Sequence, residues 1–308
     1  MVLEYLKIGL SYTVLLALVL VGVAFVTLME QKILAGSQIR VGPNYVGVWG
    51  VLQPFSDAVK LFVKEGLFLA SSNFLVYWLS PIVSLGLALF LWVIFPFLEG
   101  GMSMSYSLLF FICVSGLSVF PIMGSGWASN CKYSMLGSLR AVAQMVSYEI
   151  SLVMIVLSLI WVCSSFNLTD VVFSQSFIWN FFLFFPLSMI WFASSLAETN
   201  RSPYDFSEGE SELVSGFNTE YSAGGFVLIF MSEYANILFM GLLFVGFFLG
   251  SWVGGWLIFK MMIVVYLFVW VRATMPRYRY DKLMYLAWKG FLPISLFLFV
   301  FYLSALVL

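Results

Sequence analysis

The stretch "IGLSYTVLLALVLVGVAFVTLM", residues 8–29, contains no charged residue. An α-helix of about 20 apolar residues crosses the roughly 30 Å hydrocarbon core of a bilayer. The stretch is too long for the apolar region of a cleavable signal peptide, and no small-residue cleavage site follows it. It therefore predicts a transmembrane helix.

Seven further apolar runs follow, at roughly 74–98, 105–125, 141–163, 177–196, 222–250, 254–272 and 286–306. The 308-residue chain is 62% hydrophobic and 9% charged, whereas soluble domains are about half apolar and about a quarter charged. The runs are continuous, unlike the short alternating segments of a transmembrane β-barrel. We expect an all-α polytopic membrane protein, a single membrane domain over 1–308 with about eight transmembrane helices.

Eight crossings place both termini on one side of the membrane. Twelve of the fourteen basic residues lie in or beside the loops 30–73, 126–140, 197–221 and 273–285. Lys and Arg concentrate in loops on the cytoplasmic or matrix side. We therefore expect these four loops to face the inside and the termini to face the intermembrane space or periplasm.

The first inside loop contains a segment of helical period, residues 49–64. Its apolar residues share one face: Leu52, Phe55, Val59 and Phe62. Its polar residues share the other: Gln53, Asp57, Lys60 and Lys64. This pattern predicts an amphipathic helix that lies on the lipid surface or against a partner.

Three charged residues, Glu30, Lys32 and Arg40, lie where the first span meets this loop. They have two readings. Such side chains often anchor a helix end by extending to the interface, or they form a polar pocket at the membrane surface.

The stretch "AETNRSPYDFSEGESELVSGFNTEYSAG", residues 197–224, holds six of the fifteen acidic residues and a single arginine. Ser207 with Glu210 fits a capping box at a helix start, where acidic side chains also meet a positive dipole. A solvated acidic loop is the ordinary interpretation of such a run. Interleaved glycines and aromatic residues favour a packed structure instead.

Two acids lie within the apolar runs, Glu149 in 141–163 and Glu233 in 222–250. A carboxylate there costs several kcal/mol unless it is protonated, hydrated or paired, so it indicates a proton relay or an ion site by default. A protonated Glu bonded across helices is the alternative. Seven acids form a candidate string from the inside surface into the membrane: Glu149, Glu198, Glu208, Glu210, Glu212, Glu220 and Glu233.

Several functions are excluded by what the sequence lacks. It has no histidine, no CxxC pair among its three cysteines, and no GxGxxG or P-loop pattern. We therefore expect no metal site and no redox centre on this chain. A net charge of −1 without a basic cluster argues against nucleic-acid binding.

Four segments resemble the signature segments of one family: "QIRVGPNYVGVWGVLQPFSDAVKLFVKE", "GSLRAVAQMVSYEIS", "LAETNRSPYDFSEGESELVSGFNTEYSAG" and "WVRATMPRYRYDKLMYLAWK". The family is NADH–ubiquinone oxidoreductase chain 1, the membrane subunit of respiratory complex I that forms its quinone chamber. The likeness extends over essentially the whole chain and is closest to mitochondrially encoded members. Gln31 and Gly225 depart from the family pattern, which has arginine and proline there.

The resemblance implies a non-redox subunit of a proton-pumping NADH:ubiquinone reductase in the mitochondrial inner membrane. Ubiquinone is then the substrate, with iron–sulfur clusters and FMN on partner subunits of the peripheral arm and further membrane-arm subunits alongside. It implies a quinone tunnel lined by Glu30, Arg40, Asp57, Arg201, Asp205, Phe226, Phe230, Arg277 and Arg279. It also implies that the string of seven acids is a proton path.

Two other functions stay open at this point. A stand-alone cation/proton transporter would also use membrane carboxylates, although the sequence shows no internal repeat. A structural anchor for the peripheral arm would use the acids only for docking.

Co-purification and quinone photolabelling separate the three functions. The family resemblance predicts that the chain co-migrates with NADH dehydrogenase activity and that a quinone photolabel attaches between Glu30 and Arg279. A transporter would extract from the membrane alone. A chain that co-migrates but takes no label would be a structural anchor.

Overall fold

The structure is a computed structural model that describes residues 2–67, 70–97, 101, 104–207, 209, 215–250 and 254–307. The regular elements of this part of the chain are all helical. Those of the first half are α1 (Val2–Ser37), η1 (Val48–Gly50), α2 (Gln53–Val63), α3 (Phe74–Leu91), η2 (Trp92–Ile94), α4 (Ser107–Leu117), α5 (Val119–Ala128) and α6 (Lys132–Cys163). Those of the second half are α7 (Leu168–Ser174), α8 (Asn180–Leu183), α9 (Phe185–Glu198), η3 (Gly216–Asn218), α11 (Ala223–Phe244), η4 (Val245–Leu249), α12 (Gly254–Thr274), α13 (Tyr280–Tyr285), η5 (Leu286–Phe291) and α14 (Leu292–Val307).

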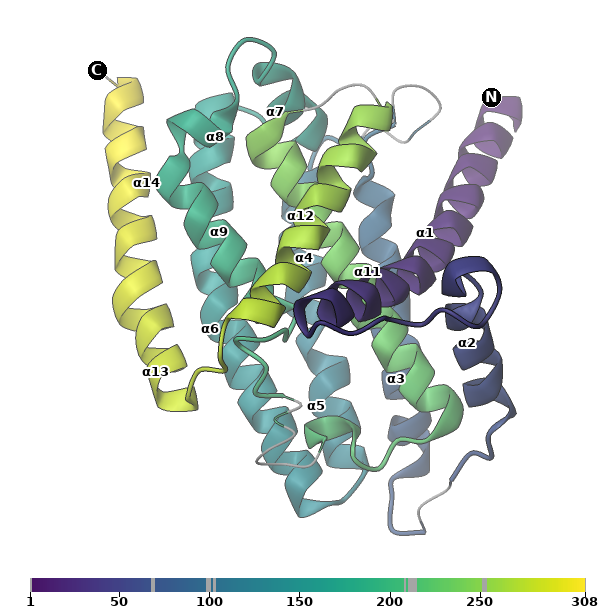
Figure 1. Cartoon of the computed structure of the whole chain (residues 1–308). Coiled ribbons are helices and arrows are strands. Elements are labelled where there is room, and N and C mark those ends of the chain that lie inside the picture. The colour runs from purple at the N-terminus through teal and green to yellow at the C-terminus, as the bar shows by residue number, and fades with distance from the viewer. Residues whose placement is uncertain are drawn as a thin grey trace.

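Within the described residues, seven helices are long and apolar enough to cross a membrane. They are Glu4–Ser37, Phe74–Ile94, Ser107–Ala128, Lys132–Cys163, Ala223–Leu249, Gly255–Thr274 and Tyr280–Ala305. The predicted all-α polytopic membrane fold is confirmed. Both ends of the chain lie at the same end of the bundle in Figure 1, as an even number of crossings requires.

The predicted span 177–196 is not one continuous helix. It is divided at Phe184 into the short α8 and the 14-residue α9. Pro186 explains the break, because proline lacks a backbone N–H and its ring clashes with the carbonyl four residues earlier. α9 alone is about 21 Å long at 1.5 Å per residue, so α8 must contribute to any crossing here.

The amphipathic helix of the first inside loop is present, but it begins four residues later than predicted. A 3-10 turn, η1, precedes α2, and Trp49 within it has a positive φ of 61°. α2 packs on α1 and α11. Its apolar residues Phe55, Val59 and Phe62 are exposed, as expected of a helix that contacts lipid or a partner.

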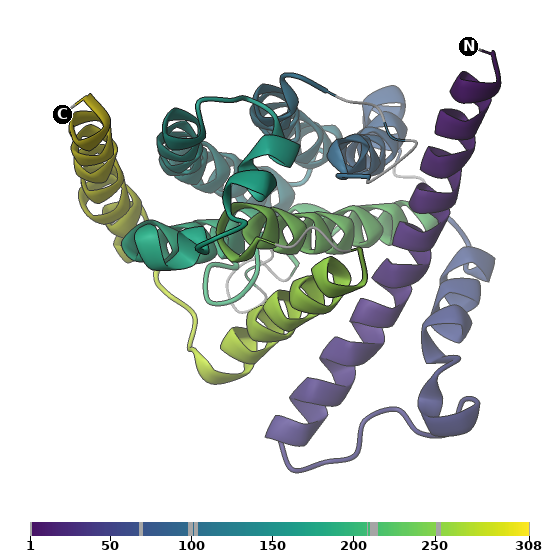
Figure 2. The same cartoon turned by 90° about the horizontal axis from the view of Figure 1, so that it is seen from above.

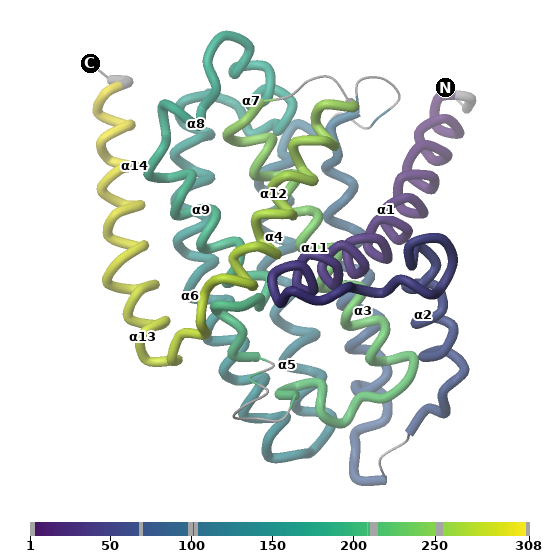
Figure 3. Tube along the Cα trace, in the orientation of Figure 1, coloured from purple at the N-terminus to yellow at the C-terminus, as the bar shows by residue number. Residues whose placement is uncertain are grey.

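The helix α11 lies at the centre of the bundle, as the view from above shows (Figure 2). It packs against α1, α2, α3, α9 and α12. α13 and α14 stand at the edge, beside α6 and α9 (Figure 3). The largest fully buried side chains include Trp191, Tyr148, Phe239 and Phe247, which fill the space between the central helices.

Small residues allow close approach beside this aromatic core, as is usual where membrane helices pack. Gly126 of α5 lies against α6, and a Cβ there would meet Oγ of Ser138 at 2.1 Å. Gly137 of α6 lies against η3, and a Cβ there would come within 2.9 Å of the backbone of Gly216 and Phe217. The contact of Gly137 with Gly216 and Phe217 therefore positions η3, which lies in the chain between α9 and α11, against α6.

Gly137→Ala should therefore destabilise the fold. The added methyl group meets backbone rather than a movable side chain, so we expect a loss of about 1–3 kcal/mol. Thermal unfolding of the detergent-solubilised protein measures this loss. Gly86→Ala in α3 is the matched control, because nothing lies within 4 Å of a Cβ there. Equal melting temperatures for the two variants would show that the α6–η3 contact is not tight.

Candidate functional site

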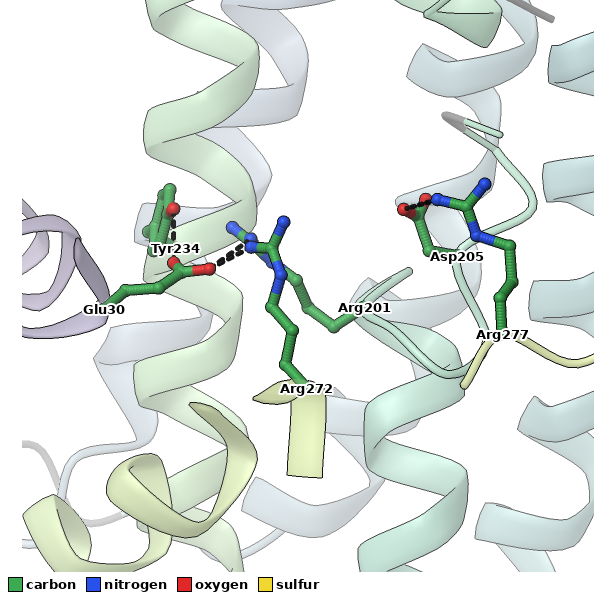
Figure 4. Close-up of polar contacts among 6 residues, drawn as sticks. All are labelled: Glu30, Arg201, Asp205, Tyr234, Arg272 and Arg277. Carbon is green, nitrogen blue, oxygen red and sulfur yellow. Dashed lines mark hydrogen bonds and ion pairs between the residues drawn. The ribbon is translucent and has the colours of Figure 1, made fainter. Parts of the chain in front are cut away.

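The carboxylate of Glu30 joins four elements of the bundle. Its Oε1 pairs with Nη1 of Arg201 at 3.3 Å and with Nη1 of Arg272. Its Oε2 accepts a hydrogen bond from the hydroxyl of Tyr234 at 2.6 Å. Figure 4 shows these side chains converging from α1, the loop after α9, α11 and α12. We call these four residues the Glu30 cluster.

The end of α9 explains how Arg201 reaches this cluster. Asn200 has a positive φ of 51°, and the N–H of Arg201 bonds to the carbonyl of Leu196. This is the Schellman geometry that ends helices, in which one residue is left-handed. Nε2 of Gln144 then holds the carbonyls of Ala197 and Tyr204, each at 2.7 Å. The turn is therefore fixed on both sides.

Positive charge exceeds negative charge in the Glu30 cluster. The side chain of Arg201 is 12% exposed and that of Glu30 is 7% exposed. The guanidinium of Arg201 lies over the ring of Tyr234, 4.2 Å from its centroid. Its Nε and Nη2 are buried without a hydrogen-bond partner. The Arg201 charge also interacts with Glu233, the residue before Tyr234.

A second ion pair lies nearby, between the chain after α9 and the chain after α12 (Figure 4). Nη2 of Arg277 is 3.1 Å from Oδ2 of Asp205. The same two segments are joined by stacked rings of Tyr204 and Tyr278, with centroids 5.6 Å apart. Arg279 pairs with Asp281 at 3.1 Å, but both of these side chains are mostly exposed.

A polar cavity of about 40 Å³ lies between α3, α5, α6, α11 and the end of α9. Its polar lining comprises two acids, two asparagines, five serines and a threonine: Glu198, Glu233, Asn200, Asn236, Ser80, Ser84, Ser118, Ser125, Ser232 and Thr199. We call it the Glu198–Glu233 cavity. One water molecule needs roughly 10–15 Å³ of such volume, so it has room for a few waters.

The helix α11 separates this cavity from the Glu30 cluster. Ile229, Ser232, Glu233 and Asn236 line the cavity, and their spacing places them on one helical face. Tyr234 and Ile237 line a smaller space of about 20 Å³ beside Glu30 and Arg201, on another face. The turn after α9 is divided in the same way, with Glu198 and Asn200 on the cavity side and Arg201 on the other.

Glu149 lies near the cavity but does not line it. It is one helical turn after Met145, which does. The carboxylate lies against α4, where a Cβ at Gly116 would be 2.9 Å from its Oε1.

Glu198 is the last residue of α9 and lies beyond the apolar run 177–196. Burial raises the pKa of the Glu198 carboxyl to about 8, and repulsion from Glu149 contributes to this shift.

The remaining predicted tunnel residues are dispersed. Arg40 lines an open surface cleft, and its Nε donates to Gln38 at 2.7 Å. Lys32, which was predicted only to anchor the helix end or to join a polar pocket, lines the same cleft. Asp57 accepts a hydrogen bond from Gln53 at 2.8 Å. The rings of Phe226 and Phe230 lie together near the start of α11, with centroids 4.2 Å apart.

The predicted proton-path acids are only partly visible. Glu220 follows η3, and its backbone carbonyl accepts a hydrogen bond from Tyr77 at 2.7 Å. Three of the acids lie outside the described part of the chain: Glu208, Glu210 and Glu212. The helix start predicted at Ser207 would extend into these residues, so it also falls outside the described part. In the described part, no three His, Cys, Asp or Glu residues are grouped in a way that could hold a metal ion.

Sequence reasoning missed part of the site. Neither Arg272 nor Tyr234 is among the residues predicted for the quinone tunnel or the proton path, although both contact Glu30. The sequence does contain a signal for Tyr234. Successive residues of a helix point about 100° apart, so Tyr234 must lie on a different face of its helix from Glu233. No signal indicated Arg272, which is separated from Glu30 by 242 positions.

Comparison with known proteins finds a match to the NADH dehydrogenase family over residues 10–303. The NADH-ubiquinone oxidoreductase chain 1 of Anopheles gambiae is 55% identical over 92% of this chain and 91% of its own length. The protein of the same name from Aedes aegypti is 53% identical over 97% of this chain and 96% of its own. That from Locusta migratoria is 53% identical over 95% and 94%.

Glu30→Gln should destabilise the protein strongly. Arg201 and Arg272 would then lose the carboxylate that they share, and breaking a buried ion pair costs about 3–5 kcal/mol. Thermal unfolding of the detergent-solubilised protein measures the loss. Asp281→Asn is the control, because it removes an exposed pair worth about 0–1 kcal/mol. Similar small losses in both variants would contradict a structural role for Glu30.

Proposed function

The chain belongs to the NADH dehydrogenase family, and from this premise we propose that it is the quinone-chamber subunit of a proton-pumping NADH–ubiquinone oxidoreductase. In this proposal it lies in the mitochondrial inner membrane as a multi-pass protein, with its termini toward the intermembrane space. It carries no redox centre. Iron–sulfur clusters and FMN are held by peripheral-arm partners, and other membrane-arm subunits continue beside it.

The proposed tunnel runs beside α1, α2 and α11. Phe226 and Phe230 offer an apolar wall for a polyisoprenoid tail, and they lie on a helix that packs on α2. Beyond them the residues become polar at the Glu30 cluster and at the Asp205–Arg277 pair. An apolar passage that ends among hydrogen-bond donors suits a quinone, whose ring has two carbonyl oxygens.

Ubiquinone reduction takes up two electrons and two protons. The electrons would come from a cluster on a partner subunit, since this sequence lacks the histidine and paired cysteines that such centres use. Before protonation, the reduced ring carries negative charge. The guanidinium groups of Arg201 and Arg272 would attract that charge, and Arg201 would then hold Glu30 and Glu233 less strongly.

One observation carries the proposal. Arg201 interacts with Glu30 on one side of α11 and with Glu233 on the other. Glu233 faces a cavity that also contains Glu198, whose pKa of about 8 suits proton exchange near neutral pH. A change of charge in the quinone chamber would thus alter the proton affinity of a carboxylate across the helix. This supports electrostatic coupling between quinone reduction and proton transfer.

Glu233→Gln tests this coupling, at the matching position of a culturable bacterial relative. The amide keeps the shape of the side chain but cannot carry a proton. We expect the complex to assemble. Either the number of protons pumped per quinone reduced falls, or pumping and turnover fall together. The expected decrease is roughly 10²-fold or more, which is the usual contribution of a positioned acid or base. Sealed vesicles allow both rates to be measured.

Glu65→Gln is the matched control, since Glu65 is an exposed acid of the first inside loop outside the cavity. Its pumping and turnover should equal those of the wild type. Normal assembly, turnover and pumping in Glu233→Gln would reject the proton path through α11. The structural-anchor alternative would then gain support.

A further inference from the structure

The polar lining of the Glu198–Glu233 cavity is rich in acceptors and poor in donors. Four of its serines donate their protons to backbone carbonyls three residues earlier in their own helices: Ser84, Ser118, Ser125 and Ser232. A hydroxyl used in this way offers only its oxygen to the cavity. The serines therefore act as acceptors from three different walls.

Three further acceptors in the cavity lining have no partner. Oε2 of Glu198, Oδ1 of Asn200 and Oδ1 of Asn236 are buried, and no protein group bonds to them. The side chain of Asn200 belongs to a residue that is only 6% exposed. A buried polar atom without a hydrogen bond costs about 1–3 kcal/mol, so native proteins rarely leave several together.

No group of the described protein bonds to these three oxygens, so a small molecule that donates hydrogen bonds would satisfy them. Water is small enough, supplies two donors per molecule, and fits a polar cavity of about 40 Å³. Arginine cannot serve, because Arg201 lies on the other side of α11. Asn236 is central to the arrangement, since it lies one helical turn from Glu233 and shares its face with Ser232.

We propose that Asn236 is a positioning residue that fixes a hydrogen-bonded water cluster between Glu198 and Glu233, and that this cluster carries the proton between them. The inference rests on the proposed function and adds a residue and a carrier to it. The amide of Asn236 does not itself gain or lose a proton. Its carbonyl oxygen accepts a hydrogen bond from one water and so orients the next.

The transfer balances without any further reactant. An O–H bond breaks at the protonated carboxyl of one glutamate, each water accepts one proton and passes on another, and an O–H bond forms at the other carboxylate. The waters are unchanged in composition and end with reversed orientation. Asn236 and Asn200 then hold the cluster while it returns to its first orientation.

Asn236→Leu tests the proposal in the intact complex of a culturable relative with asparagine at the matching position. Leucine has the same number and branching of side-chain heavy atoms but removes the acceptor. We expect protons pumped per quinone reduced to fall roughly tenfold, the change produced by losing about one hydrogen bond in the transfer. Asn236→Ser keeps an oxygen acceptor and leaves room for one more water, so it should recover at least half of the wild-type ratio.

Asn180→Leu is the matched control. Asn180 is also a buried asparagine, and its Nδ2 donates at 3.1 Å to the carbonyl of Phe247 in η4, which directly follows α11, but Asn180 does not line the cavity. It should keep the wild-type ratio of protons to electrons. If Asn180→Leu lowered the ratio as much as Asn236→Leu does, a general disturbance of α11 would explain both, and the positioning role would be rejected.

A high-resolution map of the wild-type complex supplies a test that needs no variant. We expect ordered water within hydrogen-bond distance of Oδ1 of Asn236 and Oε2 of Glu198. A dry cavity, or a bound sodium ion with turnover that depends on sodium, would overturn the inference. The two proposals can fail separately. Normal pumping in Asn236→Leu beside defective pumping in Glu233→Gln rejects only the role of Asn236, whereas normal pumping in Glu233→Gln rejects the proton path itself.

Discussion

The buried carboxylate of Glu30 is the contact that determines how the centre of this bundle is arranged. It holds α1, α11, α12 and the turn after α9 together through two arginines and a tyrosine. Arginine does not lose its proton inside proteins, so both positive charges stay whenever the helices are packed. Glu30 carries one negative charge and therefore balances only one of the two positive charges. Arg201 also interacts with the acid Glu233, on the opposite face of α11. The charge balance of the Glu30 cluster therefore depends on the protonation state of an acid that faces a different cavity.

This dependence requires the backbone around the cluster to be rigid, because a mobile turn would let Arg201 move away from an unfavourable charge. The rigidity has local causes. The left-handed Asn200 ends α9, Gln144 bonds to two carbonyls of the turn, and Gly137 lets η3 lie directly on α6. The turn is enclosed by protein on one side and by the Glu198–Glu233 cavity on the other. The cavity and the turn thus stabilise each other.

The fold could be predicted from the sequence because the bilayer imposes a length on every apolar run, and seven of the eight runs match helices of sufficient length. The run 177–196 differed because Pro186 is apolar and does not change a hydropathy pattern, although it interrupts the helix. The site was less predictable. Glu149 and Glu233 are conspicuous as acids within apolar runs, and Glu198 stands out as part of the acidic stretch 197–224. Ser118, Ser125 and Asn236 were not, because small polar residues are common in membrane helices and only the packing of α3, α5 and α11 brings them to one cavity. Contacts between distant positions, such as Arg272 with Glu30, leave no local pattern at all.

The two faces of α11 have opposite hydrogen-bonding character, and this difference gives a direction to the proposed coupling. On one face Arg201, Arg272 and the hydroxyl of Tyr234 are all donors, which stabilise added negative charge. On the other face the serine oxygens, the asparagine carbonyls and two acids are acceptors, which stabilise added protons. In the proposed coupling, an electron pair that arrives at a quinone near the first face would be attracted by the arginines. The weaker hold of Arg201 on Glu233 would then raise the affinity of that carboxylate for a proton. In this proposal the proton would enter the acceptor-rich cavity and not the donor-rich Glu30 cluster, where the two arginines would repel it. The proposed coupling would thus keep the added electrons and the transferred proton on separate faces of α11, and Arg201 would make each sensitive to the other.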